Sequence, residues 1–359
     1  MPSVLALDGA HGEGGGQILR TALSLSAITG RAFHLTDLRA RRPKPGLMPQ
    51  HLTAVRAVAA MTDAAVSGDR LGSTELVFVP RHSPKADCYT IDVAEEAQKG
   101  SAGAVTLILQ TMLPPLALAS EPSVIVLHGG THVKWAPPFD CILAAYLPPL
   151  RHIGFRVDAE LRRCGWYPTG GGELVCRIGG SPIKPTRHIR AVVRGALTRI
   201  SGRALASNLP AHISERMVKR ALATLADLGV PLNIEPQTVP ATCAGAGIFL
   251  LAEYEPLSAG FSAYGRLGKP SEAVADEATT QLRDHHNSGA TIELHLADQL
   301  LLPLALADGS SVFTMSQTTG HLQTNAWTIG QFGVAKVTIE EGRPCLVHIE
   351  PQGLSPVYG

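Results

Sequence analysis

The sequence predicts an α/β (α+β) protein built from three repeated βαβαββ units, each a four-stranded sheet with two helices, plus a smaller inserted α/β domain. Strand and helix patterns follow one order from the N-terminus, and that order returns after residue 90 and again near the end of the chain. It breaks between residues 185 and 275. We therefore expect residues 1–184 and 276–359 to form one main domain of three units, and residues 185–275 to form the inserted domain.

The first unit is predicted from a glycine-rich turn, an apolar-periodic helix that Gly30 ends, and a basic loop broken by prolines. The elements expected here are strands at residues 3–8, 32–38, 64–67 and 75–79 and helices at residues 17–28 and 50–61.

The two later units repeat this order, and their first helices, TLILQTMLPPLALA and LADQLLLPLALA, resemble TALSLSAITG of the first unit. Corresponding loops should therefore point the same way. The second unit is expected to contain strands at residues 90–94, 123–129, 155–161 and 173–178 and helices at residues 103–119 and 139–152. The third is expected to contain strands at residues 291–295, 312–315, 334–340 and 345–351 and helices at residues 296–307 and 321–329.

The inserted domain is expected to contain two strands and one helix. Residues 188–197 and 248–254 have strand patterns, and residues 213–228 form an amphipathic helix that ends at Gly229. The sequence of this domain contains no motif that indicates a function.

Composition predicts a folded, soluble and cytoplasmic protein. The chain has 359 residues, of which 45% are apolar and 17% charged. Its longest apolar stretch, residues 104–119, contains Gln110 and two prolines and is too short to cross a bilayer, and no basic leader precedes an apolar segment at the N-terminus. We expect no membrane partner.

The cysteines and the net charge exclude several classes of protein. The six cysteines are dispersed without a C-x-x-C pair, so neither a zinc site nor a disulfide framework is indicated. A net charge of +1 excludes a generally basic coat for nucleic acids and leaves only a local basic patch. Such a patch lies between Arg31 and Arg56.

His321 is the first candidate for a site residue. A strand at residues 312–315, the polar link SQTTG and the start of a helix place this histidine in a first helical turn. Unpaired N–H groups at a helix start can bind phosphate, and imidazole can be neutral and nucleophilic near pH 7. The alternative is one more surface or structural histidine among the 14 in the chain.

The glycine-rich stretch GAHGEGGGQ, residues 9–17, is a second candidate. Glycines let a backbone approach an anion closely, and Glu13 is the only charged residue in the stretch. No Gly-Lys-Ser/Thr follows, so it is not a Walker loop. The alternative is an ordinary tight turn.

Basic and polar residues near this turn could hold a polyanion. Arg39, Arg42 and Gln50 belong to the first basic link, and Arg20 lies one helical turn beyond the glycines. Guanidinium groups grip phosphate through paired hydrogen bonds, although the link could equally be a solvated loop.

Two polar residues interrupt apolar helices. Gln110 is either a satisfied core amide or a reader of a ligand, and Asp298 could simply be favourable near a helix start.

Six stretches, in order, resemble the RNA 3′-terminal phosphate cyclase family. They are DGAHGEGGGQILRTALSLSAITG, RARRPKPGLMPQHLTAV, SAGAVTLILQTMLPPLALA, GWYPTGGG, LADQLLLPLALA and GHLQTN. The resemblance covers nearly the whole chain except the inserted domain, and GEGGGQILR followed by KPGL-x-x-QHL is its most specific part. It implies that the main domain is catalytic.

The resemblance implies an enzyme that uses ATP to convert an RNA 3′-phosphate into a 2′,3′-cyclic phosphate. A histidine at the position of His321 would attack the α-phosphorus of ATP and form adenylyl-histidine, with release of pyrophosphate. AMP would then pass to the RNA 3′-phosphate, and the 2′-hydroxyl would close the ring and expel AMP. A DNA end lacks that hydroxyl and could not complete the reaction.

The resemblance also assigns roles to residues. Glu13 would hold Mg²⁺ or Mn²⁺ on the triphosphate. Arg20, Arg39, Arg42 and Gln50 match positions expected to hold triphosphate or RNA phosphate. The nucleotide pocket would be formed by Gln110, His295, Leu296, Ala297, Asp298 and Gln299.

This sequence departs from the family pattern at two places. His295 replaces an aromatic residue before LADQ, so its contact with a purine would be weaker or pH-sensitive. The loop GGTHVKWAPP also differs, which leaves base recognition there open. The physiological RNA, the preferred metal and the oligomeric state, for which a homodimer is one option, are not determined by the sequence.

Two alternatives belong to other functional classes. A catalytically silent relative would bind RNA in ribosome assembly and ribosomal RNA processing, but such relatives lack the histidine that GHLQTN provides here. An enolpyruvyl transferase shares a related repeated architecture, but we cannot place the anion-binding lysines that this activity requires.

Overall fold

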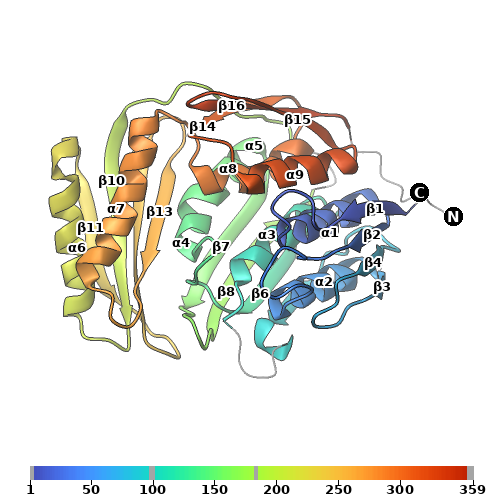
Figure 1. Ribbon diagram of the computed structural model, residues 1–359, viewed down its shortest axis with the longest axis horizontal. Helices are drawn as coiled ribbons and strands as arrows, with labels where there is room; N and C mark the ends of the chain where they lie inside the picture. Colours follow the sequence, from blue (N-terminus) through green and yellow to red (C-terminus); the bar gives the residue numbers. More distant parts are fainter. Residues whose placement is uncertain (1–3, 97–101, 182–184, 354–359) are drawn as a thin grey trace.

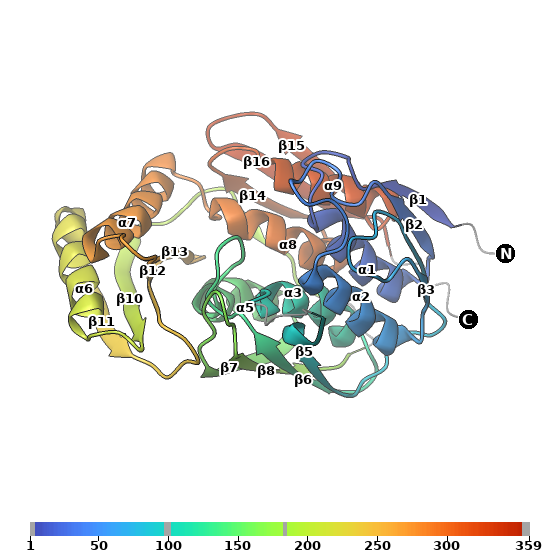
Figure 2. The ribbon, with the colours of Figure 1, turned by 60° about the horizontal axis from the view of Figure 1, so that its bottom comes forward.

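Four sheets of four strands each, with helices packed against them, make up the chain over residues 4–96, 102–181 and 185–353, the part that the structure describes (Figure 1). This computed structural model confirms the predicted mixed α/β class. In Figure 2, α1, α2, α3, α8 and α9 lie in the middle of the larger part of the molecule, and three of the sheets surround them.

The N-terminal sheet has the strand order β1-β2-β4-β3. Strands β1 and β2 pair in parallel, and the other two pairs are antiparallel. The elements are β1 (Leu5–Asp8), α1 (Gln17–Thr29), β2 (Phe33–Thr36), α2 (Pro49–Thr62), β3 (Ala65–Ser67) and β4 (Leu76–Val79).

The second sheet has the order β5-β6-β8-β7, again with one parallel and two antiparallel pairs. Its predicted second helix contains one π-helical segment. The elements are β5 (Cys88–Asp92), η1 (Val93–Glu96), α3 (Val105–Ala117), β6 (Ser123–Gly129), α4 (Phe139–Cys141), η2 (Ile142–Tyr146), α5 (Leu147–Ile153), β7 (Arg156–Arg163) and β8 (Gly172–Gly179).

The C-terminal sheet has the order β9-β14-β16-β15, with β9 parallel to β14 and the other pairs antiparallel. Strand order and direction are therefore the same in these three sheets. The elements are β9 (Arg190–Ala191), α8 (Leu294–Leu306), β14 (Ser311–Met315), α9 (Gly320–Gln331), β15 (Ala335–Glu340) and β16 (Cys345–Pro351).

The strand predicted at residues 291–295 is wrong. Glu293 is the N-cap of α8, and its carboxylate accepts hydrogen bonds from the amides of His295 and Leu296. A carboxylate that satisfies unpaired amides favours a helix start over the strand that the alternating pattern suggested. The parallel partner of β14 is instead β9, which precedes the strands of the fourth sheet in the chain.

The fourth sheet, with the order β11-β10-β12-β13, has its own apolar core against α6 and α7. That core runs from Ile200 to Leu282, whereas β9 pairs outside it. The domain limits 185 and 275 stay a prediction. The elements are β10 (Leu197–Ser207), α6 (His212–Leu225), η3 (Ala226–Leu228), β11 (Leu232–Thr238), β12 (Gly245–Tyr254), β13 (Ala259–Tyr264) and α7 (Ser271–Ser288).

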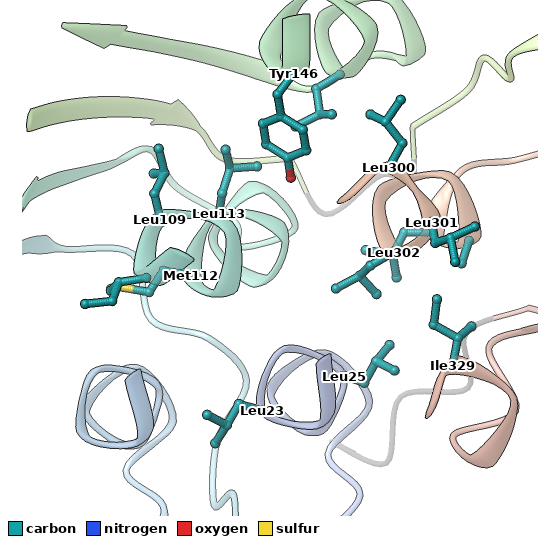
Figure 3. Close-up of a cluster of buried hydrophobic side chains, with 14 of the residues drawn as sticks. Leu23, Leu25, Leu109, Met112, Leu113, Tyr146, Leu300, Leu301, Leu302 and Ile329 are labelled. Carbon is teal, nitrogen blue, oxygen red and sulfur yellow. The ribbon is translucent and has the colours of Figure 1, made fainter. Parts of the chain in front are cut away.

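Helix α1 lies at the centre of the large apolar core. It contacts α2, α3 and α9, and eleven of its residues are buried. Figure 3 shows Leu25 of α1 pointing toward Ile329 of α9 and the leucines of α8, whereas Leu23 lies on the other side of α1. This packing brings the start of α1, at the glycine turn, close to the start of α9, at His321.

None of the helices within the described ranges combines the length and the apolar character that crossing a membrane requires.

Candidate functional site

His321 lies in the first turn of α9, as predicted. Helix α9 begins at Gly320, and the N-cap Thr319 accepts a hydrogen bond from the amide of Leu322 through its hydroxyl. The His321 side chain is 49% exposed, so a ligand can reach the ring. Partial burial lowers the pKa of His321, and Arg20 and Arg42 lower it further while Glu13 opposes them.

The structure brings Glu13 of the glycine turn directly to this histidine. Glu13 Oε2 lies 3.1 Å from His321 Nε2 and 2.6 Å from Arg42 Nη2. The other oxygen, Oε1, is buried and has no hydrogen-bond partner among the described residues. A Cβ at Gly15 would lie 2.4 Å from Oε1 and 2.6 Å from Arg42 Nη2, so the absence of a side chain there leaves room for this carboxylate.

The basic loop contributes Arg42 to the cluster and keeps Arg39 beside it. Arg39 Nη1 donates to the carbonyls of Lys44 and Gly46, both at 2.8 Å, so this guanidinium closes its own loop. Burial and the nearby charge of Arg42 lower the pKa of Arg39. The outer Arg41 donates to the carbonyl of Gly12, and this contact ties the loop to the glycine turn.

Arg20 and Asp298 are two largely buried groups near His321, and their charges influence each other. Arg20 on α1 also donates to Gln17, and burial lowers its pKa while Asp298 and Glu13 raise it. Asp298 Oδ2 lies 3.9 Å from His321 Nδ1. Burial raises the pKa of Asp298 to about 7 against the opposing effects of His295 and Arg20. This carboxyl therefore titrates close to neutral pH.

A small pocket between α1, α3, α8 and α9 adjoins this pair. Gln110 Nε2 of α3 donates to Gln299 Oε1 of α8 at 2.6 Å, and Gln299 Nε2 donates to the carbonyl of His295. Two amide side chains thus meet although they are 189 residues apart in sequence. The pocket lining includes Arg20, Gln110, Tyr146, Asp298, Gln299 and Asn325.

The other predicted nucleotide residues lie in two different environments. His295 is 75% exposed, and its Nδ1 lies 2.9 Å from Glu293 Oε1. The hydrogen bond to Glu293 raises the pKa of His295. Leu296 and Ala297 are buried in the main apolar core, so their side chains face away from solvent.

Gln50 of α2 contacts the start of α3. Its Oε1 accepts a hydrogen bond from the amide of Ala104, the N-cap residue of α3, at 3.2 Å. In this structure the Gln50 carbonyl thus satisfies a helix-start amide.

Two residues of the site were missed in the sequence. His51 is buried, and its Nδ1 accepts a hydrogen bond from the amide of Met48, so the neutral ring carries its proton on Nε2. A Cβ at Gly16 would lie 2.5 Å from His51 Nε2, which shows that this N–H group adjoins the glycine turn. Thr324 accepts a hydrogen bond from the Glu13 amide. Two features of the sequence could have pointed to these residues: His51 directly follows Gln50, and Thr324 lies one helical turn after His321.

Comparison with known proteins gives one consistent result. A family model described as RNA 3′-terminal phosphate cyclase matches residues 11–339. The chain belongs to the RNA 3′-terminal phosphate cyclase family. The expected enzyme class is thereby confirmed at the level of the family.

Relatives named RNA 3′-terminal phosphate cyclase match along nearly their whole length. The protein from Methylococcus capsulatus is 52% identical over 94% of this chain and 93% of its own. The one from Gloeothece citriformis is 47% identical over 97% and 99%, and the one from Methanopyrus kandleri is 40% identical over 98% and 100%. The cyclase match therefore includes the glycine turn, the basic loop and His321.

The buried His51 predicts how the stability of this cyclase-family protein depends on pH. Burial, with help from Arg20 and Arg39, lowers the pKa of His51 to about 3, whereas an unfolded histidine titrates near 6.5. Between these values the unfolded chain binds the extra proton, so stability falls as pH decreases from about 6.5.

We expect the free energy of unfolding to fall by about 2 kcal/mol less in His51→Asn than in wild type between pH 6.5 and 5. The asparagine oxygen can replace Nδ1 as an acceptor but does not titrate. Urea unfolding at several pH values measures the effect, and His82→Asn, at an exposed histidine, is the matched control. Equal pH slopes in wild type and His51→Asn would contradict the assignment.

Proposed function

We propose that this protein uses ATP to convert an RNA 3′-terminal phosphate into a 2′,3′-cyclic phosphodiester through adenylyl-histidine at His321. The observation that carries the proposal is the contact of the His321 ring with Glu13, which itself contacts Arg42. An exposed imidazole, a carboxylate and guanidinium groups beside a glycine turn are suited to a triphosphate. Family membership supports the RNA substrate.

In the first step, a ring nitrogen of His321 attacks the α-phosphorus of ATP. An N–P bond forms, the bond to the bridging oxygen breaks, and pyrophosphate leaves. The lowered pKa of His321 supports this role because it keeps the ring neutral, and so nucleophilic, at neutral pH. Asp298, at 3.9 Å from Nδ1, lies where it can offset the positive charge that develops on the ring.

Arg42, Arg39 and Arg20 would bind the phosphates of ATP and of the RNA end. Each keeps a guanidinium beside the glycine turn or behind the histidine, where charge-assisted hydrogen bonds to phosphate are strong. The polar pair Gln110 and Gln299, with the exposed ring of His295, would receive the nucleoside. Asp298 and the backbone of the buried Leu296 and Ala297 complete this wall.

The residues present fit a divalent cation on the triphosphate. The buried Oε1 of Glu13, without a hydrogen-bond partner among the described residues, is the kind of hard oxygen that Mg²⁺ or Mn²⁺ binds. The described residues contain no group of three metal-ligating side chains, so most ligands would come from ATP and water. When bound, the ion would neutralise charge on the phosphates.

Two further steps complete the reaction. An oxygen of the RNA 3′-phosphate attacks the phosphorus of the AMP group, and the N–P bond breaks to restore His321. The RNA 2′-hydroxyl then loses its proton as its oxygen attacks the phosphorus of the 3′-phosphate. The ring closes, the bond from that phosphorus to the bridging oxygen breaks, and AMP leaves with that oxygen. The need for a 2′-hydroxyl excludes DNA ends from this final step.

We also propose that the three sheets of equal strand order are copies of one βαβαββ unit and that the protein acts in the cytoplasm. The shared order and strand directions support the first idea. The loops before α2, α4 and α9 would then be corresponding loops. The loop before α2 carries Arg42, and the loop before α9 leads to His321.

His321→Ala should abolish the transfer of radiolabel from α-labelled ATP to the protein, because no other proposed group forms the N–P bond. Denaturing gel electrophoresis of the labelled protein measures this, and His348→Ala, at a distant histidine, is the matched control. Acid-labile labelling that persists in His321→Ala would move the nucleophile to another residue.

Arg42→Ala should reduce cyclisation of RNA 3′-phosphate by about a hundredfold, because it removes a charged phosphate donor and frees Glu13. Arg39→Ala should impair the reaction too. Lys44→Ala, at an exposed residue of the same loop, should change the rate little. Chromatographic separation of linear and cyclic ends measures the rate. Unchanged rates in both arginine variants would show that this loop is a solvated surface and does not bind the phosphates.

Removal of divalent metal should stop adenylylation, because the triphosphate charge would be unscreened. Label transfer is measured in excess chelator and after addition of Mg²⁺ or Mn²⁺, with Glu13→Gln compared at each concentration. Full activity in chelator would remove Glu13 from the proposed role.

A further inference from the structure

We propose that Thr324 on α9 is a positioning residue that locks the glycine turn, and with it the Glu13 carboxylate, against His321. This inference rests on the proposed function and concerns a residue that would touch neither ATP nor RNA. Thr324 acts through the backbone of Glu13, and the contact joins two segments 311 residues apart in sequence.

The central contact is one hydrogen bond. The amide of Glu13 donates to Thr324 Oγ1 at 3.1 Å, and Thr324 is fully buried. A buried hydroxyl and a turn amide that both need partners thus satisfy each other. Thr324 lies three residues after His321, one helical turn away. Helix α9 therefore carries both the proposed nucleophile and the hydroxyl that holds Glu13 beside it.

The backbone of the turn at Gly12 packs very closely against Thr324 of α9. A Cβ at Gly12 would lie only 2.2 Å from Thr324 Oγ1, and Gly12 has a φ of +59°, a conformation that side chains disfavour. Glycine at this position is therefore required both by its own backbone and by the closeness of Thr324.

Two neighbouring contacts also attach α9, one to the turn and one to α1. The His11 ring stacks on Trp327 of α9, with ring centres 4.0 Å apart and planes inclined by 16°. Behind the turn, Thr21 Oγ1 of α1 donates to Asn325 Oδ1 at 2.7 Å. Side chains at positions 324, 325 and 327 thus fasten α9 to the turn and to the helix that follows it.

The turn needs this external support because its own sequence provides little. Residues 14–16 are all glycine, so they contribute no side chains to packing, and glycine-rich backbone has many alternative conformations. The Glu13 carboxylate nevertheless has to remain 3.1 Å from His321 Nε2 with its Oε1 free. Functional groups need positions fixed to about half an ångström.

The test compares Thr324→Val with Thr324→Ser. Valine keeps nearly the shape of threonine but removes the acceptor, whereas serine keeps the hydroxyl. We expect Thr324→Val to slow transfer of label from α-labelled ATP by about ten- to a hundredfold. It should also raise the Mn²⁺ concentration needed for half-maximal rate. Thr324→Ser should stay within a few fold of wild type.

A double-mutant cycle with Glu13→Gln separates positioning from a general structural role. If Thr324 acts through Glu13, Thr324→Val should cause little further loss once the carboxylate is gone. A full, multiplicative loss in the Glu13→Gln background would overturn the proposal, as would a wild-type rate in Thr324→Val.

Hydrogen exchange tests the contact without reference to activity. In the intact protein, the segment 9–17 should exchange faster in Thr324→Val than in wild type, and Thr324→Ser should retain protection. His11→Ala, which removes the ring stack, provides a second variant and should increase exchange in the same segment.

The exchange and labelling results also separate two failures. Absence of label in wild-type protein would refute the adenylyl-histidine route, while the exchange rates would still decide whether Thr324 holds the turn. Unchanged exchange in both Thr324→Val and His11→Ala would refute the positioning role whatever the labelling result.

Discussion

The site depends on the contact between Glu13 and His321, which come from opposite ends of the chain. Their 3.1 Å approach exists because α1 and α9 pack side by side, each with one apolar face in the same core. The helix starts meet at the edge of that core, where unpaired amides and polar side chains remain accessible. Apolar burial thus supplies the energy that holds this carboxylate and this imidazole together.

Charge balance shapes the groups around this contact. Arg42 contacts one Glu13 oxygen, while the charged form of the largely buried Arg20 is favoured by Asp298 and Glu13. Burying these groups is costly unless opposite charges accompany them. The consequences are a carboxyl whose pKa rises to about 7 and an imidazole whose pKa falls. Such opposed shifts in one cluster are typical of reactive sites.

The arrangement of sheets explains why the site is central. Three sheets of the same strand order surround helices that pack against one another, as Figure 2 shows. The loops that precede α1, α2 and α9 then converge near one end of these helices. The fourth sheet has its own core with α6 and α7, and no predicted site residue lies in it.

Local patterns in the sequence determined most of the elements and indicated candidate site residues. Apolar periodicity placed α1, α2, α3 and α9, and Gly30 marked the end of α1, because a helix needs a regular apolar face and a residue that can end it. The glycine turn, the arginine loop and His321 were likewise legible as residue types suited to phosphate chemistry. The strand expected at residues 291–295 was wrong because Glu293 caps a helix, and an alternating pattern does not reveal a side-chain cap.

Only the tertiary structure decided which groups touch. The hydrogen bond from Glu13 to Thr324 and the one from Gln110 to Gln299 join segments 311 and 189 residues apart. The shifted pKa values of Asp298 and His51 arise from burial by elements that are remote in sequence. Burial and distance are properties of the packed chain, so the sequence could name most of the groups, though not His51 or Thr324, and could not give their contacts or their protonation.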